Sequence, residues 1–196
     1  MAENTKNIVN FFFELGQMQK IKHSGWYVAG VSDPESIAEH VHRAAEIGYV
    51  LAILENANPE KVAFMVLIHD NGEARTLDLH RICSRYVESK KGEVKAALEQ
   101  FDRLPKNIAQ RFKKIYQEFE KRKTKEAMCA KDADYLEQAI TAKEYVDLGY
   151  KGCQDWINNI KKALKTSSAR KLILEIEKTD INEWWKGLKK LPSNHV

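Results

Sequence analysis

A chain of 196 residues with 43% hydrophobic residues, 31% charged residues and a formal net charge of +4 has the composition of a globular protein with one sizeable core. Its longest apolar run, residues 62–68, is far too short for a membrane span, and the N-terminus lacks the pattern of a secretory signal. Three cysteines without metal-ligand spacing (Cys83, Cys129 and Cys153) predict reduced thiols and a cytoplasmic protein.

Helical signals dominate the first half of the chain. Residues 32–35 (SDPE) combine a capping residue, a proline suited to a first turn and an early acid, and apolar residues at helical spacing follow from Ile37 to Leu51. Asn58 and Pro59 predict the start of a second helix, whose residues 62–68 are apolar all round and therefore central and buried. A short strand is the competing interpretation of this segment, but its length and its Pro-Glu start favour a helix.

The second half of the chain continues the helical pattern, and no segment shows the alternation of a strand. Further helices are predicted over residues 93–101, 106–123, 125–149, 153–164 and 168–178. No linker-like stretch divides the chain. We therefore predict an all-α fold, a single compact helical domain over residues 1–196, with its core at residues 8–185 and a flexible tail at 190–196.

A basic stretch runs from Arg103 to Lys131, with ten Lys and Arg residues against three Glu. One interpretation is a patch for nucleic acid or phosphate, and the other is the solvated face of a helix. Because aromatic residues do not interleave the basic ones as they do on base-stacking surfaces, we favour the solvated face and do not expect a nucleic-acid partner.

The buried helix predicted at residues 62–68 ends on an adjacent pair, His69 and Asp70. An isolated carboxylate there is costly to desolvate unless a hydrogen bond or a cation compensates it. His40 lies on the preceding helix, which the short connection should pack antiparallel, and Asp132 and Asp134 lie on a later amphipathic helix. Two imidazoles and two carboxylates form a ligand set suited to Mn, Co, Fe, Mg or Zn, with positions left for water.

This constellation resembles the HD-domain metal-dependent phosphohydrolases, whose signature is a His, then a His-Asp doublet on the next helix, then a distant Asp. The resemblance implies that one divalent metal ion is bound by His40, His69, Asp70 and Asp134. Asp134 is the ligand implied by the KDADYLE segment, and Asp132 is then expected to face solvent or to lie just outside the ligand set.

Two observations limit the ligand set. His42 is not expected to bind the metal together with His40, because residues i and i+2 of a helix point about 200° apart. Dinuclear HD phosphodiesterases need additional histidines between the doublet and the last Asp, and only His80 lies there in this sequence. We therefore expect a single metal ion.

The resemblance is closer to one subgroup, the 5′-deoxynucleotidases and related HD-domain proteins, through SGW at 24–26, PESIAEH at 34–40, HDNGEARTLDL at 69–79 and AKDADYLE at 130–137. It implies hydrolysis of a deoxynucleoside 5′-monophosphate by a metal-activated water. It also implies catalytic roles for Glu73, which could orient the attacking water or protonate the leaving group, and for Asp78, which could assist or hold the metal-bound water. A nucleotide is thus the expected small-molecule partner.

The chain departs from the subgroup at one position, where relatives usually carry Arg before the SGW or TGW segment and this sequence has His23. Lys22, His23 or Arg75 could bind the substrate phosphate instead, although Arg and His differ in reach and charge. Trp26 either lines a nucleoside pocket or belongs to the core. The departure leaves open an alternative function, a protein that senses a nucleotide without turning it over.

Aromatic residues near both ends of the chain suggest self-association, as the family resemblance does. Phe11, Phe12 and Phe13 lie near the start, and Trp184 and Trp185 near the end. Self-association would cover aromatic residues that a small domain leaves exposed, and the competing interpretation is that these residues close the core. We expect a homo-oligomer, most simply a homodimer.

Overall fold

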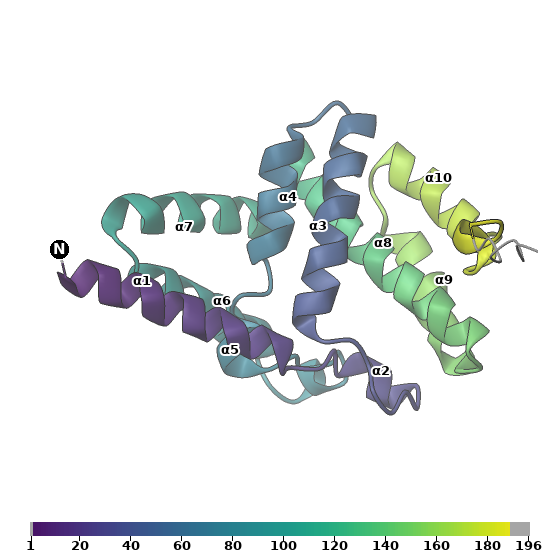
Figure 1. Cartoon of the computed structure of the whole chain (residues 1–196), viewed down its shortest axis with the longest axis horizontal. Coiled ribbons are helices and arrows are strands. Elements are labelled where there is room, and N and C mark those ends of the chain that lie inside the picture. Colours follow the sequence, from purple (N-terminus) through teal and green to yellow (C-terminus); the bar gives the residue numbers. More distant parts are fainter. Residues whose placement is uncertain (1, 189–196) are drawn as a thin grey trace, which may run out of the picture.

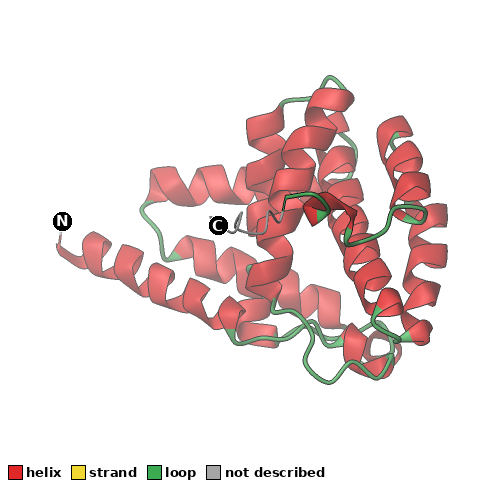
Figure 2. Cartoon of the chain, turned by 45° about the vertical axis from the view of Figure 1, so that its right-hand side comes forward, coloured by secondary structure: helices red, strands yellow, loops and turns green. Residues whose placement is uncertain are grey.

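The computed structural model describes residues 2–188, which form helices joined by loops (Figure 1). Figure 2 shows no strand within these residues, so the all-α prediction is confirmed. The helices are α1 (Ala2–Leu15), α2 (Gly25–Val28), α3 (Ile37–Leu54), α4 (Pro59–Ile68), α5 (Glu73–Thr76), α6 (Ser89–Asp102), α7 (Lys106–Lys121), α8 (Lys125–Asp147), α9 (Gln154–Ala163) and α10 (Ser167–Ile176). The tail predicted at 190–196 lies outside the described residues.

The starts of α3 and α4 show how local sequence sets the two central helices. Asn58 caps α4 as predicted, since its side chain accepts a hydrogen bond from the Lys61 amide at 2.8 Å. The prediction for α3 was wrong by one turn, because Ser36 rather than Ser32 is the cap and forms a capping box with Glu39. The reason is a long-range contact: a bridge to Lys22 keeps Ser36 extended, so that the helix cannot begin earlier.

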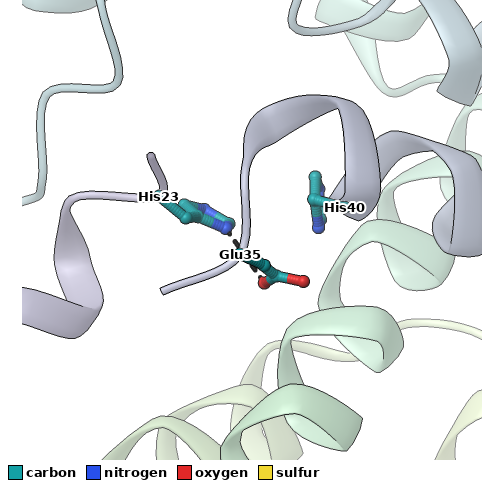
Figure 3. Close-up of side chains that lie close together, drawn as sticks. All are labelled: His23, Glu35 and His40. Carbon is teal, nitrogen blue, oxygen red and sulfur yellow. Dashed lines mark hydrogen bonds and ion pairs between the residues drawn. The ribbon is translucent and has the colours of Figure 1, made fainter. Parts of the chain in front are cut away.

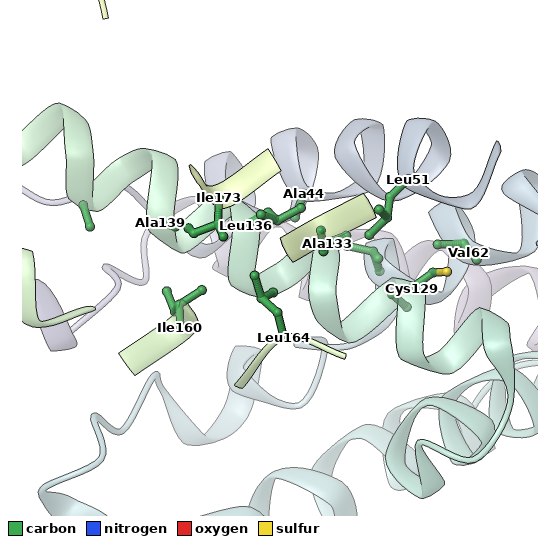
Figure 4. Packing of buried hydrophobic residues seen from close by; sticks show 14 of the residues in the cluster. Ala44, Leu51, Val62, Cys129, Ala133, Leu136, Ala139, Ile160, Leu164 and Ile173 are labelled. Carbon is green, nitrogen blue, oxygen red and sulfur yellow. The ribbon is translucent and has the colours of Figure 1, made fainter. Parts of the chain in front are cut away.

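The centre of the molecule is a layer of α3, α4 and α8, which α9 and α10 cover on one side (Figure 1). Figure 4 shows their apolar side chains meeting around α8, whose contact face carries small residues such as Ala133. Gly48 allows α3 to pack closely against α4, because a Cβ at this position would lie 3.2 Å from methyl groups of Val62 and Val66. The prediction that residues 62–68 form a central helix rather than a strand is confirmed. Close packing of α3 and α4 also brings their polar ends together.

Asp132 ties this layer to the C-terminal helices. Its buried carboxylate accepts hydrogen bonds from the Lys165 amide at 2.9 Å and from the amide and hydroxyl of Thr166 at 2.6 and 2.8 Å. Thr166 in turn caps α10. The expectation that Asp132 faces solvent or borders the metal ligands was wrong, because this carboxylate serves the loop between α9 and α10.

Replacing Asp132 by Asn should lower the free energy of unfolding by about 2–3 kcal/mol, because an amide presents a donor where backbone N–H groups need an acceptor in a buried site. Urea denaturation measures this change. Asp155→Asn is the control, since Asp155 lies on α9 and its carboxylate accepts a hydrogen bond from the exposed Asn159 side chain. A variant at position 132 as stable as the control would contradict the assigned role.

A second cluster joins α1, α6 and α7 beside α4. Phe11, Phe101 and Tyr116 are buried in it together with Ile68, the last residue of α4. The helix α1 was not predicted. Its apolar residue Phe11 is buried against α6 and α7. The cluster anchors the C-terminal end of α4, where the His-Asp pair follows.

Several apolar residues remain exposed. Phe11 closes the core, but Phe12, Phe13 and Trp184 are 61%, 73% and 76% exposed, and Trp185 is 42% exposed. These surfaces are compatible with self-association, which stays a prediction. None of the helices in residues 2–188 is long and apolar enough to cross a membrane.

Candidate metal centre

Four predicted ligands converge where α3, α4 and α8 meet. His40 lies in α3, His69 caps the end of α4, Asp70 follows it, and Asp134 lies in α8. Asp134 Oδ1 lies 3.3 Å from Nε2 of His40 and 3.8 Å from Nε2 of His69. Asp70 Oδ2 lies 3.8 and 3.0 Å from the same two nitrogens. The ligand atoms of His40, His69 and Asp134 thus lie within 4.8 Å of one another, and Asp70 approaches both histidines from the end of α4.

The two imidazoles are oriented by their other nitrogens. His69 Nδ1 donates to the carbonyl of Val66 at 2.6 Å, and His40 Nδ1 donates to the buried carboxylate of Glu137. Each Nε2 is then left with its lone pair facing the centre, as a metal ligand requires. His40 Nε2 is buried and forms no hydrogen bond within residues 2–188. This unsatisfied nitrogen and the mixed N/O donor set fit a divalent metal ion.

Glu137 is held in place from behind. Its Oε1 accepts from Arg43 Nε at 2.8 Å and from the Thr141 hydroxyl at 3.0 Å, while Arg43 also binds Glu144 at 2.8 Å. Charge-assisted hydrogen bonds of this kind fix the carboxylate and hence the plane of the His40 ring. The sequence analysis missed Glu137, although its position three residues after Asp134 on one helix face was a usable signal.

The two carboxylate oxygens of Asp134 have different partners. Its Oδ2 is paired with Lys131, one turn earlier, and the Lys131 ammonium also lies 4.5 Å from the centre of the Tyr135 ring. Its Oδ1 accepts from Gln138 at 2.7 Å and faces the two histidines. Although burial alone would raise the pKa of Asp134, Lys131 and the histidines hold it well below the usual range. The carboxylate is therefore ionised and directed at the centre.

The metal-free centre has a strong affinity for positive charge. Burial opposes the imidazolium form, yet the carboxylates of Asp70 and Asp134 raise the pKa of His69 to about 9. Burial would also raise the pKa of Asp70, but the adjacent His69 and His40 lower it to about 2. Two buried carboxylates that stabilise protons on two imidazoles would stabilise a divalent cation in their place.

Glu73 lies beside the ligands in a group of carboxylates. Its ligand atom and those of Asp70 and Glu93 all lie within 4.8 Å of one another, and Glu73 Oε2 is buried without a hydrogen-bond partner in residues 2–188. Burial and the charges of Asp70 and Asp78 raise the pKa of Glu73 well above its usual value. Gly72 makes this arrangement possible, since a Cβ there would lie 2.3 Å from the Glu93 carbonyl oxygen.

His23 and Trp26 occupy different environments. The His23 ring lies next to His40, with ring centres 4.9 Å apart, and its Nδ1 contacts Glu35 Oε1 at 3.3 Å (Figure 3). Burial opposes its charged form, but the bond to Glu35 raises the pKa of His23. Trp26 is only 1% exposed and packs on Trp156. Of the two alternatives for Trp26, the buried position favours the core, and a role in a nucleoside pocket stays a prediction.

Asp78 and Arg75 make contacts that the sequence did not predict. The carboxylate of Asp78 accepts from the Ser24 amide, while the Ser24 hydroxyl donates to the Asp78 carbonyl at 2.8 Å. Arg75 pairs with Glu14 of α1, and Nη2 donates to it at 3.0 Å. Its guanidinium is therefore paired within the fold, and the role of Arg75 in substrate binding stays a prediction. His42, as expected, points away from the centre and is exposed.

A family model described as "HD domain" matches residues 15–176. The 5′-deoxynucleotidase HDDC2 of Dictyostelium discoideum is 31% identical over 147 residues, which are 71% of this chain and 77% of that protein. The human 5′-deoxynucleotidase HDDC2 is 25% identical over 151 residues, 76% of this chain and 74% of that protein. Among solved structures, a conserved hypothetical protein from Pyrococcus furiosus superposes with a TM-score of 0.73 at 27% identity, covering 87% of this chain and 99% of that one. The chain described here therefore belongs to the HD-domain family.

Proposed function

We propose that this protein is a metal-dependent 5′-deoxynucleotidase, which hydrolyses a deoxynucleoside 5′-monophosphate to the nucleoside and phosphate. The observation that carries the proposal is the convergence of His40, His69, Asp70 and Asp134 on one point, with a buried and unsatisfied His40 Nε2. The names of the curated relatives support the substrate class.

The ligand set suits one divalent ion, with Mn, Co, Fe, Mg and Zn as candidates. When bound, such an ion lowers the pKa of a coordinated water and polarises a phosphoryl oxygen. His40 and His69 would each contribute Nε2, and Asp70 and Asp134 one carboxylate oxygen each. The protein supplies the fixed orientation of these groups.

Two further carboxylates are assigned to the reaction. Glu73 is proposed to orient the attacking water or to protonate the leaving 5′ oxygen, which its buried oxygen without a hydrogen-bond partner among the described residues supports. Asp78 is proposed to assist the reaction, and its hydrogen bond from the Ser24 amide ties it to the segment that carries His23. His23 is assigned to the substrate phosphate, in the place of the expected arginine.

The test is direct. Protein stripped of metal by a chelator and reloaded with Mn or Co should release phosphate from at least one of a panel of deoxynucleoside 5′-monophosphates, while the stripped protein should not. Ribonucleoside monophosphates and a generic aryl phosphate complete the panel. Failure to turn over any phosphoester with every metal tested would refute the proposal.

A nucleotide-sensing protein is the second candidate, and the contact between His23 and Glu35 favours it, because a histidine already bound to a carboxylate has less capacity for phosphate than a free arginine. This function predicts nucleotide binding to the metal-loaded protein without product. Phosphate release at ordinary enzyme rates decides against it.

Nucleic acid is not a proposed partner. Two basic residues of the stretch from Arg103 to Lys131 are paired with acids, Lys113 with Asp102 and Lys131 with Asp134. A homodimer and a cytoplasmic location remain part of the proposal, and a monomeric mass by light scattering would contradict the dimer.

A further inference from the structure

Glu35 contacts both His23, which lies beside the ligand His40, and the buried core residue Trp26. The segment around His23 runs antiparallel to the segment that precedes α3, and the His23 amide donates to the Glu35 carbonyl at 2.9 Å. The side chains meet as well, since His23 Nδ1 contacts Glu35 Oε1 at 3.3 Å. Figure 3 shows Glu35 between His23 and His40. Backbone and side chain thus fix His23 to the same residue.

The carboxylate of Glu35 is itself held by buried groups. Trp26 Nε1 donates to Oε1 at 3.2 Å, and the oxygen of the Thr141 hydroxyl, which donates to Glu137, lies 3.3 Å from Oε2. The amide of Glu35 donates to the Tyr145 hydroxyl at 3.1 Å. Since Trp26 is buried and packs between Tyr145 and Trp156, these donors do not move freely. Glu35 is therefore a preorganised acceptor for the His23 imidazole.

A second cation site is the competing explanation of the three neighbouring groups His23, Glu35 and His40. His40 cannot serve it, because Nδ1 is bound to Glu137 and Nε2 faces Asp134 and Asp70. Arg43 also places a positive charge 4.0 Å from Glu35 Oε2. We therefore interpret Glu35 as a hydrogen-bond partner that supports His23 and not as a ligand of a second cation.

We infer that Glu35 is a positioning residue for substrate recognition, which holds the His23 imidazole against the metal centre so that its other nitrogen is available to the substrate. Within residues 2–188 no group is hydrogen-bonded to His23 Nε2, whereas Nδ1 is engaged. The inference rests on the proposed nucleotide-binding function. It adds that substrate affinity and metal affinity depend on different carboxylates, Glu35 behind His23 and Glu137 behind His40.

The experiment compares Glu35→Gln, His23→Ala and the double variant with the wild type. Glu35→Gln keeps the size of the side chain and removes its charge, so we expect the KM for the preferred deoxynucleoside monophosphate to rise about tenfold, while kcat and the Mn²⁺ affinity change less than about twofold. The double variant should be no worse than His23→Ala alone, because Glu35 acts through His23. Glu144→Gln is the matched control, since Glu144 also binds Arg43 but has no contact with His23.

Several outcomes would overturn the inference. One is an unchanged KM in Glu35→Gln, and another is an additive loss in the double variant. A third is a parallel loss of Mn²⁺ affinity, which would mean that Glu35 acts through His40. Trp26→Phe, which removes the N–H donor together with one ring of a buried side chain, should cause a smaller rise in KM and is the second variant if Glu35→Gln does not fold. An inactive wild type would refute the proposed function. In that case calorimetry measures the binding of dAMP to the same Mn²⁺-loaded variants, and a lower dAMP affinity in Glu35→Gln than in the wild type still supports the role of Glu35.

Discussion

Replacing Asp134 by Asn should weaken divalent metal binding by more than about 100-fold, the upper range for losing a residue that only supports a ligand. Asp134 Oδ1 lies near the Nε2 atoms of both histidines. An asparagine there offers only a neutral oxygen to the metal ion, and its NH₂ group cannot bind a metal ion. Calorimetric titration with Mn²⁺ measures the affinity. Phosphate release should fall with metal occupancy.

Metal removal should also be visible in stability. A ligand that binds only the folded state stabilises it by about 2.7 kcal/mol at 100 times its Kd, so Mn²⁺ should raise the melting temperature of the wild type and not that of Asp134→Asn. Asp132→Asn is the matched control, because Asp132 is equally buried on the same helix but faces the loop before α10. That control should bind Mn²⁺ like the wild type. Equal Mn²⁺ affinity in Asp134→Asn would show that the ligand set is wrong.

The affinity for metal should rise with pH. In the metal-free protein the pKa of His69 is raised to about 9, so this imidazole carries its second proton at neutral pH, and the neighbouring carboxylates raise the pKa of His40 as well. The proton on His69 stabilises the metal-free fold below the unfolded-state value of about 6.5, and the stabilisation is lost as the pH rises through 9. Because a metal ion must displace this proton, its binding releases protons and tightens across the same window.

The central helices and the ligands were predictable because their signals are local. The Asn58-Pro59 start, the apolar run that follows and the adjacent His69-Asp70 pair lie within one short segment, and local capping and burial decide its structure. Asp132 and Asp134 are a harder case. Both are buried on α8, and residues two apart on a helix point to opposite sides, so one faces the metal ligands and the other faces α10.

Pairings between distant segments were not predictable. Arg75 pairs with Glu14 on α1, and nothing in the local pattern of either segment shows that they meet. The start of α3 depends in the same way on the bridge between Lys22 and Ser36. Glu35 and Glu137 were missed for a related reason: a carboxylate in a helical sequence usually faces solvent, and only the folded arrangement places these two behind histidines.

Glu73→Gln should lower kcat by about 10²–10⁴-fold, the usual contribution of a positioned acid or base, while Mn²⁺ affinity stays close to that of the wild type. Glu73 is not among the four converging ligands, but its buried Oε2 has no hydrogen-bond partner in the described residues and lies beside Asp70. The fold should tolerate the change. Burial raises the pKa of Glu73, so this carboxyl opposes folding above its unfolded-state pKa of about 4.3, and a neutral glutamine of the same size removes that cost.

Glu93→Gln is the matched control for this prediction, because Glu93 belongs to the same carboxylate group but is paired with Lys90 at 2.8 Å. Its kcat should stay within a few-fold of the wild type. Single-turnover measurements on metal-saturated protein separate a slower chemical step from slower product release. If Glu73→Gln retains wild-type kcat with full metal occupancy, Glu73 does not take part in proton transfer, and the group that orients the water must be sought among the remaining polar residues of the site.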